Sequence, residues 1–153
     1  MALRTLILAF AFTTAAAANG LAAGQLTAVE SKHSVADAAG RLVKALEAKG
    51  IKVAAQIDHA AAAQAVGLDM PPAMVVMFGN PKLGTPLMLA DPEIAIDLPM
   101  RMLIWQGADG KVRVGYADPA KLKERYALDG QEDIVKTMSG ALAAFAKAAA
   151  DGP

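Results

Sequence analysis

The strongest constraint on the fold is an apolar segment that runs directly into a connection rich in Gly and Pro. Residues 73–78 are uninterrupted and apolar, which favours a strand buried on both faces. Phe78 to Met88 then reads Phe-Gly-Asn-Pro-Lys-Leu-Gly-Thr-Pro-Leu-Met. Because Gly permits unusual dihedrals and Pro fixes φ, this run predicts a shaped loop. Thr85 and Pro86 match a helix N-cap and first helical position, so a short helix is expected next.

The N-terminal residues have the three parts of a secretory signal peptide. Arg4 supplies positive charge, Leu6 to Phe12 is apolar, and Ala16 to Ala18 offers small residues for cleavage. The apolar part is shorter than the roughly 20 residues that a membrane-spanning helix needs. We therefore expect a signal peptide over 1–18, with an alternative end near 24, and a periplasmic or secreted mature protein.

Composition limits the classes of partner. Residues 25–150 are predicted to form one domain, long enough for a single hydrophobic core. The chain has 15 Lys and Arg against 15 Asp and Glu, so no nucleic acid and no membrane is expected as a partner after cleavage. It has no Cys, which excludes disulfides and thiol chemistry. No motif indicates a cofactor, and none is expected.

The order of periodic segments predicts an α+β fold with a mainly antiparallel sheet of about five strands and helices packed on one face. The predicted strands cover 25–31, 51–57, 73–78 and a hairpin between Leu98 and Tyr116. Predicted helices begin after Ser34, Asp58 and Asp118, and the last begins near Asp129.

The hairpin also predicts which side chains share a face. With a loop of two or four residues, one face would carry Arg101, Leu103, Trp105, Val112, Val114 and Tyr116. We expect the helices to cover that face. The opposite face would carry Met100, Met102 and Ile104, which are too apolar to stay in water, and is predicted to be a dimer surface or the floor of a ligand site.

Short motifs give the chain a family resemblance. They are Gly-Asn-Pro-Lys-x-Gly-Thr-Pro at 79–86, Ser-Lys-His-Ser at 31–34, Asp-His at 58–59, Asp-Leu-Pro at 97–99 and Tyr-Ala-Asp-Pro at 116–119. With them, the chain resembles the bacterial and archaeal family called domain of unknown function 302. The resemblance implies a compact α+β domain with a curved antiparallel sheet and no established activity. Similar sequences often have His in place of Tyr126.

The candidate ligand-binding residues are polar groups beside these segments: Asn80, Lys82, Thr85, Arg101 and Tyr116. The first three could meet an anion near a helix N-terminus, or they could merely cap turns while Lys82 stays solvated. Arg101 is expected to contact Tyr116 or Asp118 and to hold the end of its strand.

Metal and catalytic sites have little support in the sequence. His33 and His59 are the only imidazoles, so they are weak candidates for metal ligands, and no metal is predicted. Lys82 does not directly follow the second Gly, as a nucleotide-binding P-loop requires. No catalytic residue is assigned.

Three functions remain open. We expect an exported, non-catalytic binding or accessory module for a small polar ligand or a protein partner. One alternative is an enzyme with a site around Asn80, Lys82, Arg101 and Tyr116, and another is a structural homodimer without a ligand. A deep pocket that joins those four side chains would favour the first two functions, and a flat apolar patch over Met100 and Met102 would favour the third.

Overall fold

The structure is a computed structural model, and it describes residues 26–151. The predicted signal peptide lies outside these residues. The elements, in chain order, are β1 (Leu26–Ser31), α1 (Val35–Ala48), β2 (Lys52–Asp58), α2 (His59–Gln64), β3 (Ala73–Gly79), α3 (Pro81–Ala90), the 3-10 helix η1 (Pro92–Ile96), β4 (Met100–Gln106), β5 (Val112–Ala117), the 3-10 helix η2 (Pro119–Glu124) and α4 (Glu132–Asp151).

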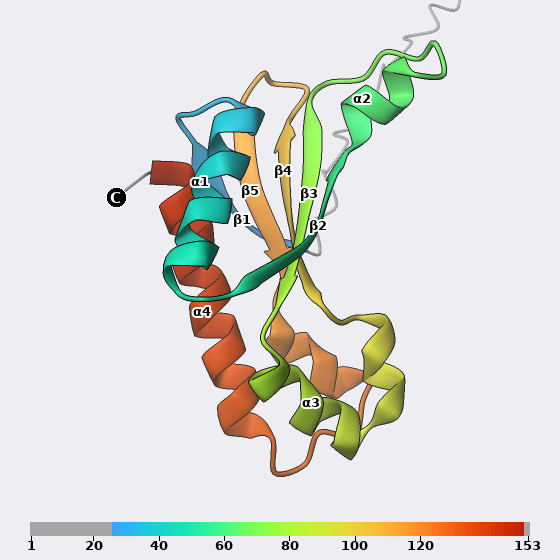
Figure 1. Cartoon of the computed structure of the whole chain (residues 1–153), viewed down its shortest axis with the longest axis vertical. Coiled ribbons are helices and arrows are strands. Elements are labelled where there is room, and N and C mark those ends of the chain that lie inside the picture. Colours follow the sequence, from blue (N-terminus) through green and yellow to red (C-terminus); the bar gives the residue numbers. More distant parts are fainter. Residues whose placement is uncertain (1–25, 152–153) are drawn as a thin grey trace, which may run out of the picture.

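The five strands form one antiparallel sheet in the order β1-β5-β4-β3-β2. Figure 1 shows α1 and α4 side by side over one face of this sheet. Buried residues of both helices form a hydrophobic core with β3, β4 and β5. The prediction of an α+β domain with five antiparallel strands and helices on one face is confirmed.

Burial along β3 differs between its two faces. Val76 and Phe78 are buried beneath the helices, whereas Val75 and Met77 on the other face are partly exposed. The prediction that this strand is buried on both faces was therefore wrong, because α1 and α4 cover the sheet from one side only.

The register of the β4–β5 hairpin differs from the predicted one by a single residue. Gln106 pairs with Val112, so the connection spans residues 107–111, an odd number. Gly110 adopts a φ of +75° in this turn, a conformation that suits Gly. Strand side chains alternate between the two faces of a sheet. A connection with an odd number of residues therefore places each β4 side chain on the face opposite to the one that an even loop predicts.

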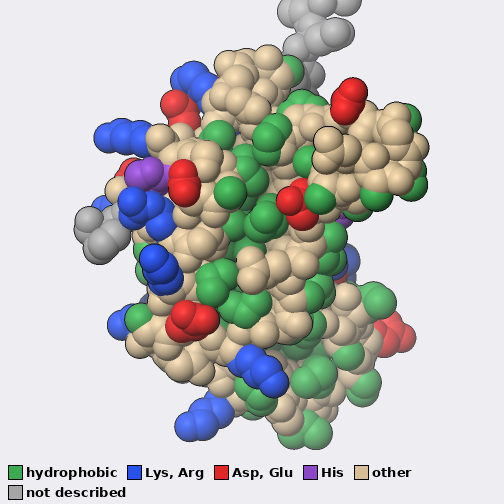
Figure 2. Space-filling view, turned by 45° about the horizontal axis from the view of Figure 1, so that its top comes forward, with side chains coloured by type: hydrophobic (Ala, Val, Ile, Leu, Met, Phe, Trp, Pro, Cys, Tyr) green, Lys and Arg blue, Asp and Glu red, His purple; other side chains and the backbone are tan. Residues whose placement is uncertain are grey.

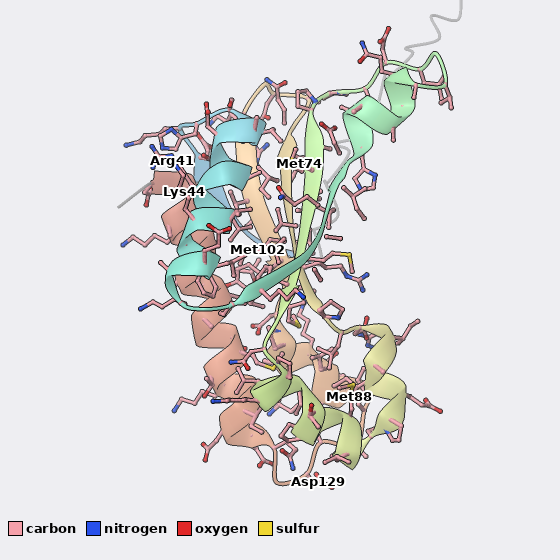
Figure 3. All side chains as sticks on the ribbon, in the orientation of Figure 1. Arg41, Lys44, Met74, Met88, Met102 and Asp129 are labelled. Atoms are coloured by element: carbon pink, nitrogen blue, oxygen red, sulfur yellow. The ribbon has the colours of Figure 1, made fainter. Side chains whose placement is uncertain are left out.

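This exchange overturns the predicted dimer surface. Met102 and Ile104 are 0% exposed, and Figure 3 shows Met102 on the helix-covered side of the sheet. Leu103 and Trp105 instead lie on the opposite, partly exposed face. A homodimer stays a prediction, but these two buried side chains cannot form its surface.

A second hydrophobic cluster lies beyond the end of the sheet. It consists of Leu87, Ile94, Leu122, Leu128, Val135 and Met138. In Figure 1, α4 runs from beside the sheet down past its lower end, and it contributes to both clusters. Met100, at the start of β4, packs against both. The site described below lies at this junction.

The surface mixes both signs of charge. In the face shown in Figure 2, Lys and Arg side chains lie mainly along one edge with acidic residues among them, and hydrophobic side chains run down the middle. Within residues 26–151, no helix combines the length and the apolar character that a membrane span requires.

Candidate functional site

A pocket of about 620 Å³ lies where β3 ends and α3 begins. Its walls come from the start of β2, the end of β3, the first two turns of α3, the segment from Ala95 to Met100, and the middle of α4. These walls belong to both hydrophobic clusters, so the pocket is the space left where the two clusters meet. Its volume falls within the range of about 300–1,000 Å³ that is usual for small-molecule sites.

Asn80 is the N-cap of α3 and determines how the chain passes from β3 into that helix. Its Oδ1 accepts a hydrogen bond of 3.0 Å from the backbone N–H of Lys82, and Pro81 occupies the first position of α3. Only Asn80 separates β3 from α3, so the segment predicted to be a shaped loop is instead the end of a strand followed by a helix. The N-cap predicted at Thr85 was wrong, because Asn80 and Pro81 already start the helix one turn earlier.

The two Gly residues of the motif make room for Leu98 and Pro99. A Cβ on Gly79 would lie 3.1 Å from Cβ of Pro99, and one on Gly84 would lie 3.6 Å from Cδ1 of Leu98. Neither Gly has a positive φ. Their role is therefore close packing, and it lets the Leu98–Pro99 segment form one wall of the pocket.

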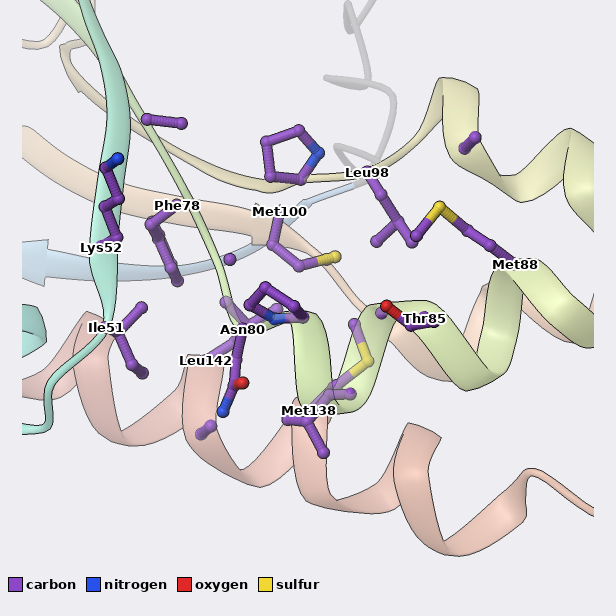
Figure 4. Close-up of a pocket in the computed structure, with 18 of the residues that line it drawn as sticks. Ile51, Lys52, Phe78, Asn80, Thr85, Met88, Leu98, Met100, Met138 and Leu142 are labelled. Carbon is purple, nitrogen blue, oxygen red and sulfur yellow. The ribbon is translucent and has the colours of Figure 1, made fainter.

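The lining is mainly apolar. Figure 4 shows Met88, Met100 and Met138 reaching into the pocket region from α3, β4 and α4. Phe78, Ile51 and Leu142 add further apolar surface. Thioether side chains are flexible and polarisable, so a wall rich in Met can adapt to ligands of different shape.

Three exposed residues supply the main polar side-chain groups: Lys52, Asn80 and Thr85. Lys52 is the only charged residue in the described lining, which contains no Asp, Glu or His. This combination of an apolar wall and a few polar groups is typical of sites for small organic molecules.

The structure brings only two of the five predicted site residues into this pocket. Asn80 and Thr85 line it, whereas Lys82, Arg101 and Tyr116 do not. Lys82 is exposed on α3. Tyr116 is 6% exposed in the core beneath the helices, where burial raises the pKa of its hydroxyl. The predicted residues therefore do not form one site. Of the four residues of the predicted enzyme site, only Asn80 lines this pocket.

Arg101 belongs to a separate cluster around Asp97. Oδ2 of Asp97 accepts hydrogen bonds from the Tyr126 hydroxyl at 2.6 Å and from Arg125, and Oδ1 lies 3.4 Å from Arg101. The bond to Asp97 raises the pKa of Tyr126. The expected contact of Arg101 with Tyr116 or Asp118 was wrong. Asp97 immediately precedes Leu98, so the cluster anchors the segment that forms one pocket wall.

The two His residues lie apart from this pocket. His33 borders a surface cavity of about 720 Å³ beside Arg41 and Lys44, and its Nε2 is buried without a hydrogen-bond partner among the described residues. His59 is exposed at the start of α2. No group of three or more His, Asp, Glu or Cys within residues 26–151 is arranged to hold a metal ion.

Sequence reasoning missed Lys52 and the Met side chains of the pocket. Lys52 opens an edge strand and pairs with Gly79 across the β2–β3 ladder. A correct pairing of these two strands would have placed it beside the motif. The Met residues come from three separate elements, and no local spacing indicates that they meet.

Known proteins resemble this chain in sequence and in fold. It is 40% identical over 114 residues to the fluoride-specific ion channel FluC 1 of Brucella suis, and to the FluC 2 channel of Brucella melitensis. The match covers 74% of this chain but only 45% and 42% of those proteins, so the chain spans less than half of their length.

The crystal structure of an uncharacterized conserved DUF302 protein from Bacillus stearothermophilus has a similar fold. The TM-score is 0.71 at 20% sequence identity, and the match covers 80% of this chain and 95% of that one. A family model, the domain of unknown function DUF302, matches residues 27–145. The chain therefore belongs to the DUF302 family.

Proposed function

We propose that this protein is a non-catalytic binding module that holds a small, largely apolar molecule in the pocket between β3, α3 and α4. The observation that carries this proposal is the pocket itself, with its volume of about 620 Å³ and its walls of Met, Leu, Ile and Phe. Burial of apolar ligand surface would supply most of the binding free energy, at roughly 25 cal/mol per Å².

The chemistry of the lining supports binding over catalysis. Proton transfer in enzymes usually relies on His, Asp, Glu, Lys, Tyr or Cys. Of these, the described lining offers only Lys52, which is exposed. Asn80 and Thr85 can donate and accept hydrogen bonds and would orient a ligand. The ligand therefore has an apolar body, a revision of the small polar ligand expected from the sequence.

Native mass spectrometry of the protein purified from its own host tests this proposal. A retained organic molecule should appear as a mass above that of the polypeptide and should be lost on denaturation. The Ala141→Phe variant, which places a ring in the pocket, should carry less of it. The Ala144→Phe variant changes an exposed position of the same helix and should carry the wild-type amount. Equal retention by both variants would contradict the assignment of the site.

We also propose that the module acts after export. The support is the order of charged, apolar and small residues over 1–18. An exported binding module would meet its ligand in the periplasm or outside the cell.

A second candidate function is suggested by the relatives. Because proteins named as fluoride channels match this chain over less than half of their length, the chain could be an accessory domain that acts with a membrane ion channel. Deleting its gene and measuring growth in fluoride tests this idea. Increased sensitivity that the intact gene restores would support it, and unchanged growth would contradict it.

A further inference from the structure

We infer that the ligand is an amphipathic anion whose charged group is bound by Lys52 and whose apolar tail extends along the pocket toward Met88. This inference rests on the proposed function and names the class of ligand. It starts from the distribution of charge. Every wall of the pocket is uncharged except at Lys52, and no carboxylate lines the described part of the site.

Within the described part of the chain, Lys52 has no ion-pair partner and is available to an external anion. The ion pairs within residues 26–151 are Arg101–Asp97, Lys111–Glu30, Arg113–Asp109 and Arg125–Asp97, and none involves Lys52. The β2–β3 ladder places Lys52 directly opposite Gly79. Its backbone position beside the pocket is therefore fixed by the sheet, while its side chain is exposed and can meet a ligand in solvent.

The arrangement of the lining suits a molecule with two different ends. In Figure 4, Lys52 lies on β2 at one end of the lining and Met88 lies on α3 at the other, with Phe78 and Met100 between them. A carboxylate, sulfate ester or phosphate ester could contact Lys52 at the solvated end. The hydrocarbon part would then contact the apolar walls, where a charge would be poorly solvated.

A cationic head would be disfavoured at the same position. It would be repelled by the Lys52 ammonium group, and the described lining has no acidic side chain to attract it. A neutral head would lack the ionic contact with Lys52 and would keep only apolar contacts and uncharged hydrogen bonds. The inference therefore predicts an order of affinity in which the anion binds most tightly and the cation least.

Three probes with the same hydrocarbon tail test this order: decanoate, decanol and decyltrimethylammonium. Their binding to the purified protein is measured by isothermal titration calorimetry, below their micelle concentrations and near neutral pH. Wild-type protein should prefer decanoate. The Lys52→Met variant keeps the apolar stem and should bind decanoate roughly fivefold more weakly, the upper range for an exposed ion pair. Its affinity for decanol should not change.

The control variant is Lys49→Met, which removes the same charge at an exposed position outside the lining. It should leave all three affinities at their wild-type values and so separate a local contact from an effect of net charge. The Lys52→Glu variant should reverse the order of the charged probes.

The outcomes separate the two claims. If wild-type protein and Lys52→Met show the same ratio of decanoate to decanol affinity, the inference is wrong while binding of apolar molecules stands. If none of the probes binds the wild-type protein, the proposed function fails together with the inference.

Discussion

Gly79 and Pro99 approach so closely that a Cβ on Gly79 would lie 3.1 Å from Cβ of Pro99. Gly79→Ala should therefore destabilise the protein by about 1 kcal/mol, because the neighbouring wall must shift to admit the methyl group. Urea denaturation measures this change in the free energy of unfolding.

Gly84→Ala is the matched comparison. Its Cβ would make an ordinary contact of 3.6 Å with Leu98, and Ala favours a helix over Gly by up to about 1 kcal/mol. This variant should be as stable as the wild type or more stable. The packing account is wrong if Gly84→Ala is the more damaging substitution.

The Tyr126–Asp97 hydrogen bond should contribute measurably to stability. Tyr126→Phe removes the donor of a 2.6 Å bond to Asp97, so the free energy of unfolding should fall because the carboxylate loses a hydrogen-bond partner. Tyr116→Phe is the control, because the hydroxyl of Tyr116 has no hydrogen bond within residues 26–151 and its removal should have a smaller effect. Equal losses in chemical denaturation would contradict a specific role for the Tyr126 bond.

Asp118 should make stability depend on pH in acid. Its Oδ1 accepts hydrogen bonds from the backbone N–H of Ala120 at 3.0 Å and from the Ser139 hydroxyl at 2.7 Å, and these lower the pKa of the carboxyl. Because the folded pKa is the lower one, this stabilisation is fully present above the unfolded pKa of about 3.9. It is lost as the pH falls from there through the folded pKa.

The Ser139→Ala variant tests that linkage. It should be less stable near neutral pH by about 1 kcal/mol and should lose less stability on acidification than the wild type. Unfolding curves collected from about pH 5 to about pH 2 measure the difference. An acid dependence identical to that of the wild type would show that Ser139 does not affect the titration of Asp118.

Export predicts a defined mature N-terminus. N-terminal sequencing of the protein from periplasmic or secreted fractions should begin at Asn19, or near Gln25 if the alternative cleavage point is used. A protein that keeps Met1 and stays in the cytoplasm would contradict the prediction.

Local signals predicted most of the fold. Ser34 caps α1 through the backbone N–H of Asp37, and the apolar spacing of α1 and α4 matches the faces that they bury. These features depend on residues three or four positions apart, which a sequence displays directly.

The hairpin register could not be predicted in the same way. It depends on whether the connection after Gln106 is odd or even, and a single residue decides which face is buried. The Gly at position 115, within a strand, was one signal of the correct register. In the structure it makes room for the ring of Trp105, which a Cβ on Gly115 would approach to 2.9 Å. A strand Gly that accommodates an aromatic ring on the neighbouring strand would have placed the two on the same face.

The candidate site was predicted in part. Asn80 and Thr85 belong to the Gly- and Pro-rich motif at 79–86, and both line the pocket. Met138 and Lys52 reach the same pocket from α4 and β2, distant parts of the chain that only the tertiary fold brings together. A pocket between two hydrophobic clusters has no local pattern, so its existence required the structure.

Binding of a neutral apolar dye to the pocket tests the central claim most directly. N-phenylnaphthylamine should gain fluorescence with wild-type protein and with Ala144→Phe. The gain should fall severalfold with Ala141→Phe, since Ala141 lines the pocket and Ala144 does not. Circular dichroism should show the same fold for all three proteins. Equal dye binding by the two variants, or no binding by the wild type, would contradict the proposal that this pocket is the functional site.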